Sequence, residues 1–392
     1  MSQTHTDKAS KSRLLALDIL RGITIAGMIL VNNPGSWSDV YAPLLHAQWN
    51  GLTPTDLVFP FFMFIMGIST YLSLRKYDFQ FSWSSLSKIL RRTVVIFLIG
   101  LFLAWFGLFL GGILSDKTFL EAVANFDHIR ILGVMPRLAL SYGFGATLAL
   151  LIPNKGLPWF VAILLAVYAV LLLAGNGFEF SDANVIAIVD NKVLGPNHMY
   201  TSHMNGETLK FDPEGLLSTL PSIAHVLIGF LCGGLIMKTK DNAVRMNYLF
   251  IVGTILTFSG FLLDYGLPIN KKVWSPTFVL TTCGLASLLL GLLIWIIDVK
   301  GHKRWCRFFE SFGINPLFLY CFSTFAAIII GRIKVPYGDD TASIKTCFFD
   351  GVLLPLSCGN TTLASLLFAL CFVMFNWVIG YILYRKRIII TI

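Results

Sequence analysis

Two side chains near residue 50 have the types and the spacing needed to move a proton. His46 lies in a polar segment, and Asp56 follows ten residues later, at the start of a long apolar run. Imidazole is the side-chain group that titrates closest to neutral pH, and a carboxylate can orient it as a base. We therefore expect His46 and Asp56 to meet if the chain between them folds back. A histidine without chemistry, in a surface loop, is the alternative interpretation.

A charged pair lies inside the first apolar run. Asp18 and Arg21 are three residues apart, so they share one face of a helix. An unpaired charge inside a membrane costs several kcal/mol, which makes this pair informative. Two interpretations stay open: a buried ion pair that orients the helix, or an Arg21 that lines an aqueous entry and meets an anionic ligand from the cytoplasm.

Further polar groups precede later apolar runs. Arg130 stands before one of them, Asp212 and Glu214 before another, and Lys271 and Lys272 before a third. Acidic residues are favourable at the positive N-terminus of a helix. Asp212 and Glu214 are therefore either helix caps or ligand-binding groups.

The composition predicts which elements must position these residues. Of 392 residues, 56% are hydrophobic and 13% are charged, with a mean hydropathy of +0.73. So few charges cannot cover a water-facing surface, which excludes a soluble enzyme. The net charge of +9 comes from short basic clusters between apolar runs, so we expect no nucleic-acid partner. The chain is predicted to be a polytopic protein of the lipid bilayer.

Ten apolar runs are long enough to cross about 30 Å of hydrocarbon as helices. They cover residues 14–34, 56–74, 86–111, 131–151, 157–175, 216–237, 246–264, 276–298, 312–331 and 361–384. We therefore predict an all-α transmembrane helix bundle of about ten spans. No linker or repeat divides it, so residues 1–392 are expected to form one domain. Residue Pro316 is expected to break the ninth span near its inner end.

The distribution of basic residues predicts the orientation. Most Lys and Arg residues fall in alternate short loops, which the positive-inside rule places in the cytoplasm. Both termini are then cytoplasmic, with residues 1–12 as a cytoplasmic tail, and the longer loops face outward. Cys347 and Cys358 share the last outer loop, where a disulfide is an open expectation. The cysteines and histidines lack zinc spacing, so no metal is expected.

Five segments resemble one known family when they are taken in order. The chain is similar to the heparan-alpha-glucosaminide N-acetyltransferase family, and in particular to its shorter bacterial members, from residue 13 onward. The segments are LDILRGITIAGMILVNNPG, HAQWNGLTPTDLVFPFFMFIMG, IRILGVMPRLALSY, FDPEGLLSTLPSI and LPINKKVWSPTFVL.

The resemblance implies transfer of acetyl from cytosolic acetyl-CoA to a glucosamine amine across a bacterial inner membrane. It implies a catalytic His46 as general base, with Asn32 beside it as an oxyanion donor and Asp56 nearby. Basic residues in the family motifs are expected to bind acetyl-CoA: Arg21, Arg130, Arg137, Lys271 and Lys272. The sugar is expected to contact Trp49, Asn50, Asp212, Glu214 and Trp274, although tryptophans at a membrane edge are often belt residues.

Several alternatives stay open at this point. The amine attacks acetyl-CoA directly, or His46 first takes the acetyl group and passes it on. A secondary transporter of amino sugars or small organic acids would also need about ten spans and intramembrane charges. A homo-oligomer is a further open expectation, because the small residues Gly107 and Gly111 present a face that packs against helices or subunits.

Overall fold

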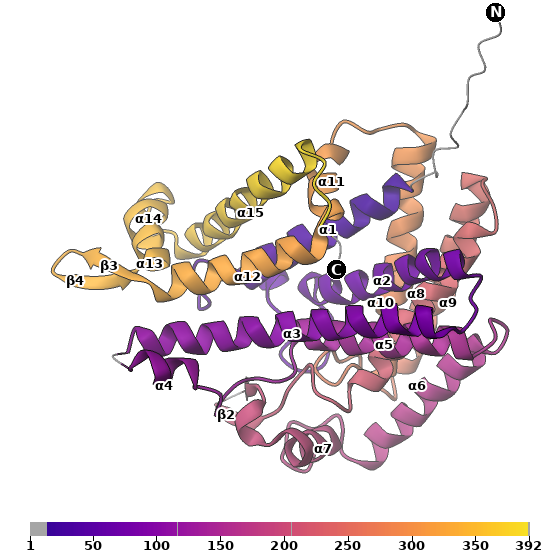
Figure 1. The fold of residues 1–392 in the computed structure, drawn as a ribbon, viewed down its shortest axis with the longest axis horizontal. Coiled ribbons are helices and arrows are strands. Elements are labelled where there is room, and N and C mark those ends of the chain that lie inside the picture. The colour runs from indigo at the N-terminus through magenta and orange to yellow at the C-terminus, as the bar shows by residue number, and fades with distance from the viewer. Residues whose placement is uncertain (1–13, 116, 205, 391–392) are drawn as a thin grey trace, which may run out of the picture.

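The structure is a computed structural model that describes residues 14–115, 117–204 and 206–390. The predicted tail of residues 1–12 lies outside the described residues. Almost all of its regular structure is helical (Figure 1). The long helices are α1 (Leu15–Asn32), α2 (Val58–Leu74), α3 (Trp83–Ile113), α5 (Val134–Leu151), α6 (Leu157–Ala174), α8 (Thr219–Met237), α9 (Asn242–Asp264), α10 (Pro276–Leu293), α12 (Pro316–Arg332) and α15 (Thr361–Arg385).

Shorter elements lie between the long helices. The short helices are α4 (Phe119–Val123), α7 (Val185–Leu194), α11 (Cys306–Ile314), α13 (Ile344–Phe348) and α14 (Leu354–Leu356). Four strands form two antiparallel hairpins: β1 (Thr201–Met204) with β2 (Glu207–Lys210), and β3 (Lys334–Tyr337) with β4 (Asp340–Ser343). In the first hairpin Thr201 pairs with Lys210, and in the second Lys334 pairs with Ser343.

The predicted transmembrane bundle of about ten spans is confirmed. Within the described ranges, nine helices are long and apolar enough to cross a membrane, and α11 with α12 makes a tenth candidate, bent by 85°. The bend lies at Asn315, where Pro316 cannot donate a backbone hydrogen bond. Asn315 is buried and binds the chain near the C-terminus instead, through Nδ2 to the Ile388 carbonyl (2.8 Å) and Oδ1 to the Ile390 amide (2.8 Å).

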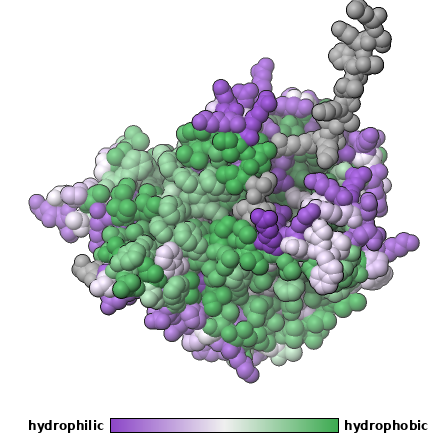
Figure 2. All heavy atoms as spheres, viewed as in Figure 1, coloured by the Kyte–Doolittle hydropathy of each residue, from purple (hydrophilic) through white to green (hydrophobic). Residues whose placement is uncertain are grey.

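The helices differ in how much of their surface is buried. In α8, 72% of the most apolar 18-residue stretch is buried inside the protein, whereas in α3 the buried share of the corresponding stretch is 11%. Helix α3 runs across the face of the molecule that Figure 1 shows. Figure 2 shows hydrophobic side chains over the middle of that face, with hydrophilic ones gathered at its edges. An apolar belt of this kind is what contact with lipid requires, because hydrocarbon cannot solvate polar groups.

Helices α2 and α8 cross closely at the centre of the bundle. A Cβ atom on Gly67 would lie 2.1 Å from the Val226 carbonyl oxygen, and one on Gly229 would lie 2.2 Å from the Phe64 carbonyl oxygen. Only glycine fits at both positions, since any side chain would overlap the facing backbone. This contact fixes the spacing of two helices whose ends lead to the polar segments described below.

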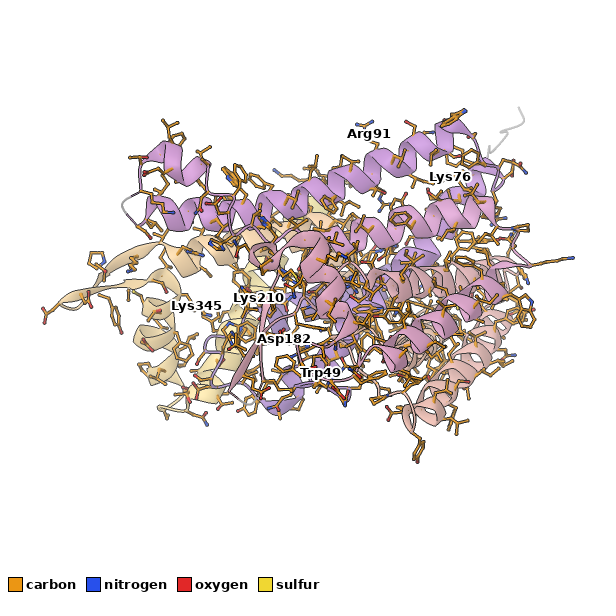
Figure 3. All side chains as sticks on the ribbon, turned by 90° about the horizontal axis from the view of Figure 1, so that it is seen from below. Trp49, Lys76, Arg91, Asp182, Lys210 and Lys345 are labelled. Atoms are coloured by element: carbon orange, nitrogen blue, oxygen red, sulfur yellow. The ribbon has the colours of Figure 1, made fainter. Side chains whose placement is uncertain are left out.

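Two segments predicted as loops contain short helices and strands. Helix α7 and the β1–β2 hairpin lie within the predicted outer loop of residues 176–215, and the β3–β4 hairpin lies within that of 332–360. In Figure 3, Lys210 and Lys345 of these segments lie toward one end of the molecule, and Lys76 and Arg91 lie toward the other.

The structure also bears on the disulfide and on the homo-oligomer that the sequence left open. Cys347 and Cys358 are free thiols, so no disulfide joins them in this structure. The small face of α3 is used within the chain, because a Cβ on Gly111 would lie 2.3 Å from Nη1 of Arg332 at the end of α12. Gly107 faces Ile328 of the same helix more loosely, at 3.9 Å. A homo-oligomer therefore gains no support from this face.

Candidate functional site

A cavity of about 640 Å³ opens at the end of α1 where α1 meets the 44–48 loop. Its size is within the range of small-molecule sites. Segments far apart in the sequence form its wall: the end of α1, the loop before α2, the β1–β2 hairpin, the segment before α8 and the segment before α10. Its polar or charged lining residues are Asn32, His46, Gln48, Asp56, Arg130, Tyr200, Ser202, His203, Glu214, Lys271 and Lys272.

The structure brings His46 and Asp56 together on this wall. His46 Nδ1 lies 2.7 Å from Asp56 Oδ1. The other carboxylate oxygen accepts hydrogen bonds from the Ala47 amide (3.1 Å), the Thr53 amide (3.1 Å) and the Thr53 hydroxyl (2.9 Å). Asp56 is therefore fixed by three donors, and it holds Nδ1 of a histidine whose side chain is 42% exposed. The second ring nitrogen, Nε2, is not held by Asp56.

Lys271 completes this group from 225 residues away. Its Nζ lies 3.0 Å from His46 Nδ1, 3.4 Å from His46 Nε2 and 3.4 Å from Asp56 Oδ1. Two contacts hold the segments together: the Gly51 amide donates to the Ile269 carbonyl (2.7 Å), and Asn270 Nδ2 donates to Asn50 Oδ1 (3.0 Å). Asn50 thus positions the loop of His46. Burial lowers the pKa of Lys271, and the charges of Asp56 and Glu214 oppose that shift.

Arg130 also lies on the cavity wall, but two carboxylates already bind it. Its Nε and Nη2 donate to Asp212 at 2.9 and 2.6 Å, and Nη2 donates to Glu214 at 2.5 Å. Burial alone would raise the pKa of Glu214, yet the charge of Arg130 and its other basic neighbours lowers it. Asp212 also accepts from the Glu214 amide (2.9 Å), whereas Ser218 is the N-cap residue of α8. Neither acid caps that helix.

Three of the expected site residues are buried away from the cavity. Arg137 donates to the carbonyls of Pro213 (3.1 Å) and Gly215 (3.0 Å), and its guanidinium lies 5.2 Å from the ring of Trp274. Trp274 is 0% exposed. Trp49 is also buried, and its Nε1 donates to the Phe178 carbonyl at 2.6 Å. These three side chains support the wall from behind, and Trp37 is the tryptophan that lines the cavity.

Arg21 lies at a second cavity, of about 280 Å³, where α1 and α2 meet α12. It donates to Asp18 Oδ1 (2.8 Å) and to the Ser69 hydroxyl (2.8 Å). Arg92 of α3 lines the same cavity, with its guanidinium 4.6 Å from the ring of Tyr142. Within the described part of the chain, no hydrogen-bond acceptor reaches the buried Arg92 Nε. This basic cavity is suited to an anion.

A third cavity, of about 170 Å³, lies between the other two. It shares Arg130 and Val134 with the cavity of His46, which is called the outer cavity below because the predicted orientation places it toward the outer face. Its wall continues to Pro136 of α5 and Tyr320 of α12. The basic cavity is lined by the next residues along the same two helices, Leu138 and Leu317 among them. The linings of the three cavities therefore follow one another along α5, at Val134, Pro136 and Leu138, and the middle and basic cavities also share α12.

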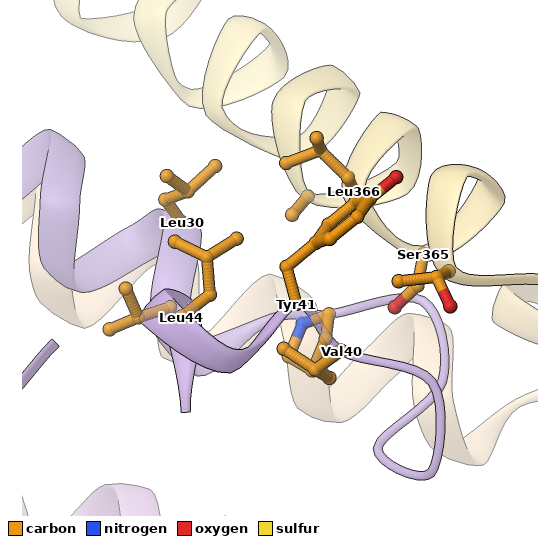
Figure 4. Close-up of a pocket in the computed structure, with 10 residues that line it drawn as sticks. Leu30, Val40, Tyr41, Leu44, Ser365 and Leu366 are labelled. Carbon is orange, nitrogen blue, oxygen red and sulfur yellow. The ribbon is translucent and has the colours of Figure 1, made fainter. Parts of the chain in front are cut away.

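A fourth pocket lies beside the entrance of the outer cavity (Figure 4). It holds only about 10 Å³, between the end of α1, the 40–44 segment and α15. In Figure 4, Leu30 and Leu44 lie on one side of this pocket, and Tyr41, Leu366 and Ser365 lie on the other. A space this small and apolar is a packing defect rather than a substrate site.

Several residues that line these cavities were not predicted as site residues from the sequence. Tyr200, Ser202 and His203 come from the β1–β2 region, and short mixed strands of four residues carry no strong pattern. Arg92 of α3 was not among the residues expected to bind acetyl-CoA. The signal that could have found Arg92 is its position within the predicted span of residues 86–111, immediately before the continuous apolar stretch of α3.

The fold and this site define a polytopic helical membrane protein with a carboxylate–imidazole pair on the wall of a polar cavity. Residues 13–265 match the model of the catalytic region of heparan-alpha-glucosaminide N-acetyltransferase, so the chain belongs to that family. It is 28% identical over 372 residues to the heparan-alpha-glucosaminide N-acetyltransferase of Mus musculus, covering 81% of this chain and 54% of the relative. It is 29% identical over 368 residues to that of Homo sapiens, covering 79% and 52%. The chain spans about half the length of these relatives.

Proposed function

We propose that this protein is a transmembrane acetyltransferase that moves acetyl from cytoplasmic acetyl-CoA to the amine of a glucosamine-type sugar on the outer side. The observation that carries the proposal is the His46–Asp56 pair, 2.7 Å apart on the wall of a polar cavity, in a member of this family. The relatives are named for acetylation of a glucosaminide amine, and that substrate class is extended here to this chain.

The chemistry needs a base on the acceptor side, because a sugar amine near neutral pH is largely ammonium. Since Nδ1 of His46 donates to Asp56, Nε2 is the nitrogen that takes the proton. The free amine then attacks the thioester carbonyl, forming a C–N bond as the C–S bond breaks. The nitrogen of the tetrahedral intermediate loses its second proton to solvent. Coenzyme A leaves as a thiolate and recovers a proton from the imidazolium, so one proton is released to solvent in each transfer.

Asn32 is the residue proposed to stabilise the oxyanion of the tetrahedral intermediate. It lines the same cavity as His46, at the last turn of α1. A donor of this kind is worth about 3 kcal/mol in acyl transfer. A relay in which His46 carries the acetyl group would use the same residues, and trapping of labelled acetyl on His46 without sugar distinguishes it from direct transfer.

The donor is proposed to enter from the opposite side. Acetyl-CoA cannot cross lipid, so its phosphates must stay at the cytoplasmic face while the pantetheine arm reaches the outer cavity. Arg21 and Arg92 would bind the phosphates in the basic cavity, and the middle cavity between α5 and α12 would admit the arm. In this orientation the protein lies in a bacterial inner membrane with both termini on the cytoplasmic side. The positive-inside rule supports that placement of the termini.

The direct test is acetyl transfer by the purified protein in nanodiscs. With acetyl-CoA and glucosamine, the wild type is expected to release free thiol and to form N-acetylglucosamine in equal amounts, measured by thiol reagent and mass spectrometry. His46→Ala is expected to lower the turnover by about 10² to 10⁴, because the general base is lost.

The matched control is His128→Ala, which removes an exposed histidine of the 124–130 segment and is expected to retain wild-type turnover. Wild-type turnover by purified His46→Ala would refute the assignment of His46. Uptake of glucosamine into liposomes without thiol release would refute the enzyme and favour a transporter.

A further inference from the structure

The contact with Asp56 creates a difficulty for His46 as a base. A carboxylate within hydrogen-bond distance favours the protonated imidazole, and a carboxylate at this range commonly shifts a pKa by about 1 to 3 units. An imidazolium has no lone pair with which to accept a proton. A carboxylate with no compensating charge nearby would therefore favour the form of the imidazole that cannot act as a base.

Lys271 supplies the missing compensation. Its ammonium lies 3.0 and 3.4 Å from the two ring nitrogens, at nearly the same range as the Asp56 carboxylate. The Lys271 side chain is 15% exposed, so water screens its charge only partly. The remaining charged or titratable groups on the cavity wall are Arg130, Tyr200, His203, Glu214 and Lys272. Arg130 and Glu214 neutralise each other in part.

A role in binding coenzyme phosphates fits Lys271 less well. Asp56 already neutralises part of the charge of Lys271. In addition, the basic cavity with Arg21 and Arg92 lies at the far end of the row of cavities. Lys272 points to another neighbour, with its Nζ 5.8 Å from the ring of Trp49. Of the two adjacent lysines, only Lys271 is therefore within reach of His46.

We propose that Lys271 is a positioning residue that keeps His46 unprotonated, so that Asp56 orients the imidazole without retaining a proton on Nε2. The inference rests on the proposed function, because a base is needed only for the transfer. It predicts that the charge of Lys271, rather than its shape, controls the ionisation of His46.

The test reads the ionisation of His46 without using catalysis. Diethyl pyrocarbonate acylates only unprotonated imidazole, and mass spectrometry of the His46 peptide gives the rate at each pH. Lys271→Met and Lys271→Gln both remove the positive charge, and their side chains differ in shape. Each variant is measured if gel filtration shows that it is folded. Either is expected to react about tenfold more slowly than wild type at pH 6, which corresponds to a pKa raised by about one unit, and at the same rate at pH 9.

Two further variants make the result specific. Lys271→Arg keeps the charge and is expected to react like wild type at pH 6. Lys210→Met removes a charge at the end of β2, outside the cavity lining, and is expected to change nothing. Asp56→Asn is expected to act in the opposite direction and to speed the reaction at pH 6, which keeps the proposal testable if neither neutral Lys271 variant folds.

Rates at pH 6 within twofold of wild type for a folded neutral variant would overturn the proposal, and so would equal slowing in Lys271→Arg. Neither outcome touches the proposed function, which fails separately if the wild type releases no thiol from acetyl-CoA in the presence of glucosamine.

Discussion

The two charged groups on the outer cavity wall have different structural roles. Asp56 shares one oxygen between His46 and Lys271, whereas Arg130 is bound by both Asp212 and Glu214. In the first group, Nε2 of His46 is not bound to the carboxylate and lies 3.4 Å from Lys271 Nζ. The second satisfies its own charges, and it therefore fixes the segment before α8 at the edge of the cavity.

A buried acid behind this wall is expected to make stability depend on pH. Asp190 of α7 accepts from the Leu217 amide (3.1 Å), and within the described chain its other oxygen has no hydrogen-bond partner. Burial raises its pKa to about 6 from 3.8. Between these values the folded protein binds the proton that the unfolded chain has lost, so the free energy of unfolding falls as pH rises from about 4 to 6.

The charged form of Asp190 is expected to cost up to about 3 kcal/mol above that window. Asp190→Asn imitates the protonated acid and is expected to unfold at a higher temperature than wild type at pH 7 but at the same temperature at pH 4. Asp182→Asn, at an exposed site before α7, serves as control. Thermal unfolding in detergent measures the difference, and parallel pH curves for wild type and Asp190→Asn would contradict the account.

At the scale of elements, the α2–α8 crossing determines where the polar segments meet. Gly229→Ala would place a Cβ 2.2 Å from the Phe64 carbonyl oxygen, so the helices must separate. Overpacking of this kind typically costs about 1 to 3 kcal/mol, and we expect a lower unfolding midpoint in detergent.

Gly331→Ala is the matched control, because a Cβ there meets no atom within 4 Å. It is expected to leave the midpoint unchanged or slightly raised, since alanine favours helix over glycine. An equal fall in both variants would mean that the crossing is not the tight contact described above.

The elements themselves were largely predictable, because runs such as residues 157–175 are long, apolar and bounded by polar residues. The predicted break before Pro316 is present, since proline removes a donor at a fixed place in the sequence. The β1–β2 hairpin was not predictable, because its four-residue strands gain their pairing from tertiary context.

The site was predictable only in part. The His46–Asp56 contact follows from a short return of the chain, but the contact of Lys271 with His46 joins residues 225 positions apart. No local pattern encodes such a distance. The same holds for Trp274, whose burial depends on packing of α5 and α10 rather than on its own neighbours in sequence. Its interpretation as a sugar contact therefore has no cavity in this structure to support it.

At the scale of the whole molecule, the cavities give the proposal its direction. The outer cavity holds the imidazole, the basic cavity holds Arg21 and Arg92, and the middle cavity lies between them along α5 and α12. Figure 2 shows that the face of the molecule drawn there is apolar in its middle, as contact with lipid requires.

The most direct measurement is transfer across a sealed bilayer. Proteoliposomes are loaded with glucosamine, and acetyl-CoA labelled in its acetyl group is added outside. In protein molecules whose side with Lys76 and Arg91 (Figure 3) faces the outside of the vesicle, labelled N-acetylglucosamine is expected inside the vesicle and free coenzyme A outside it. Product that forms only on the side of acetyl-CoA, or glucosamine that leaves the vesicles without coenzyme A release, would contradict transfer through the chain.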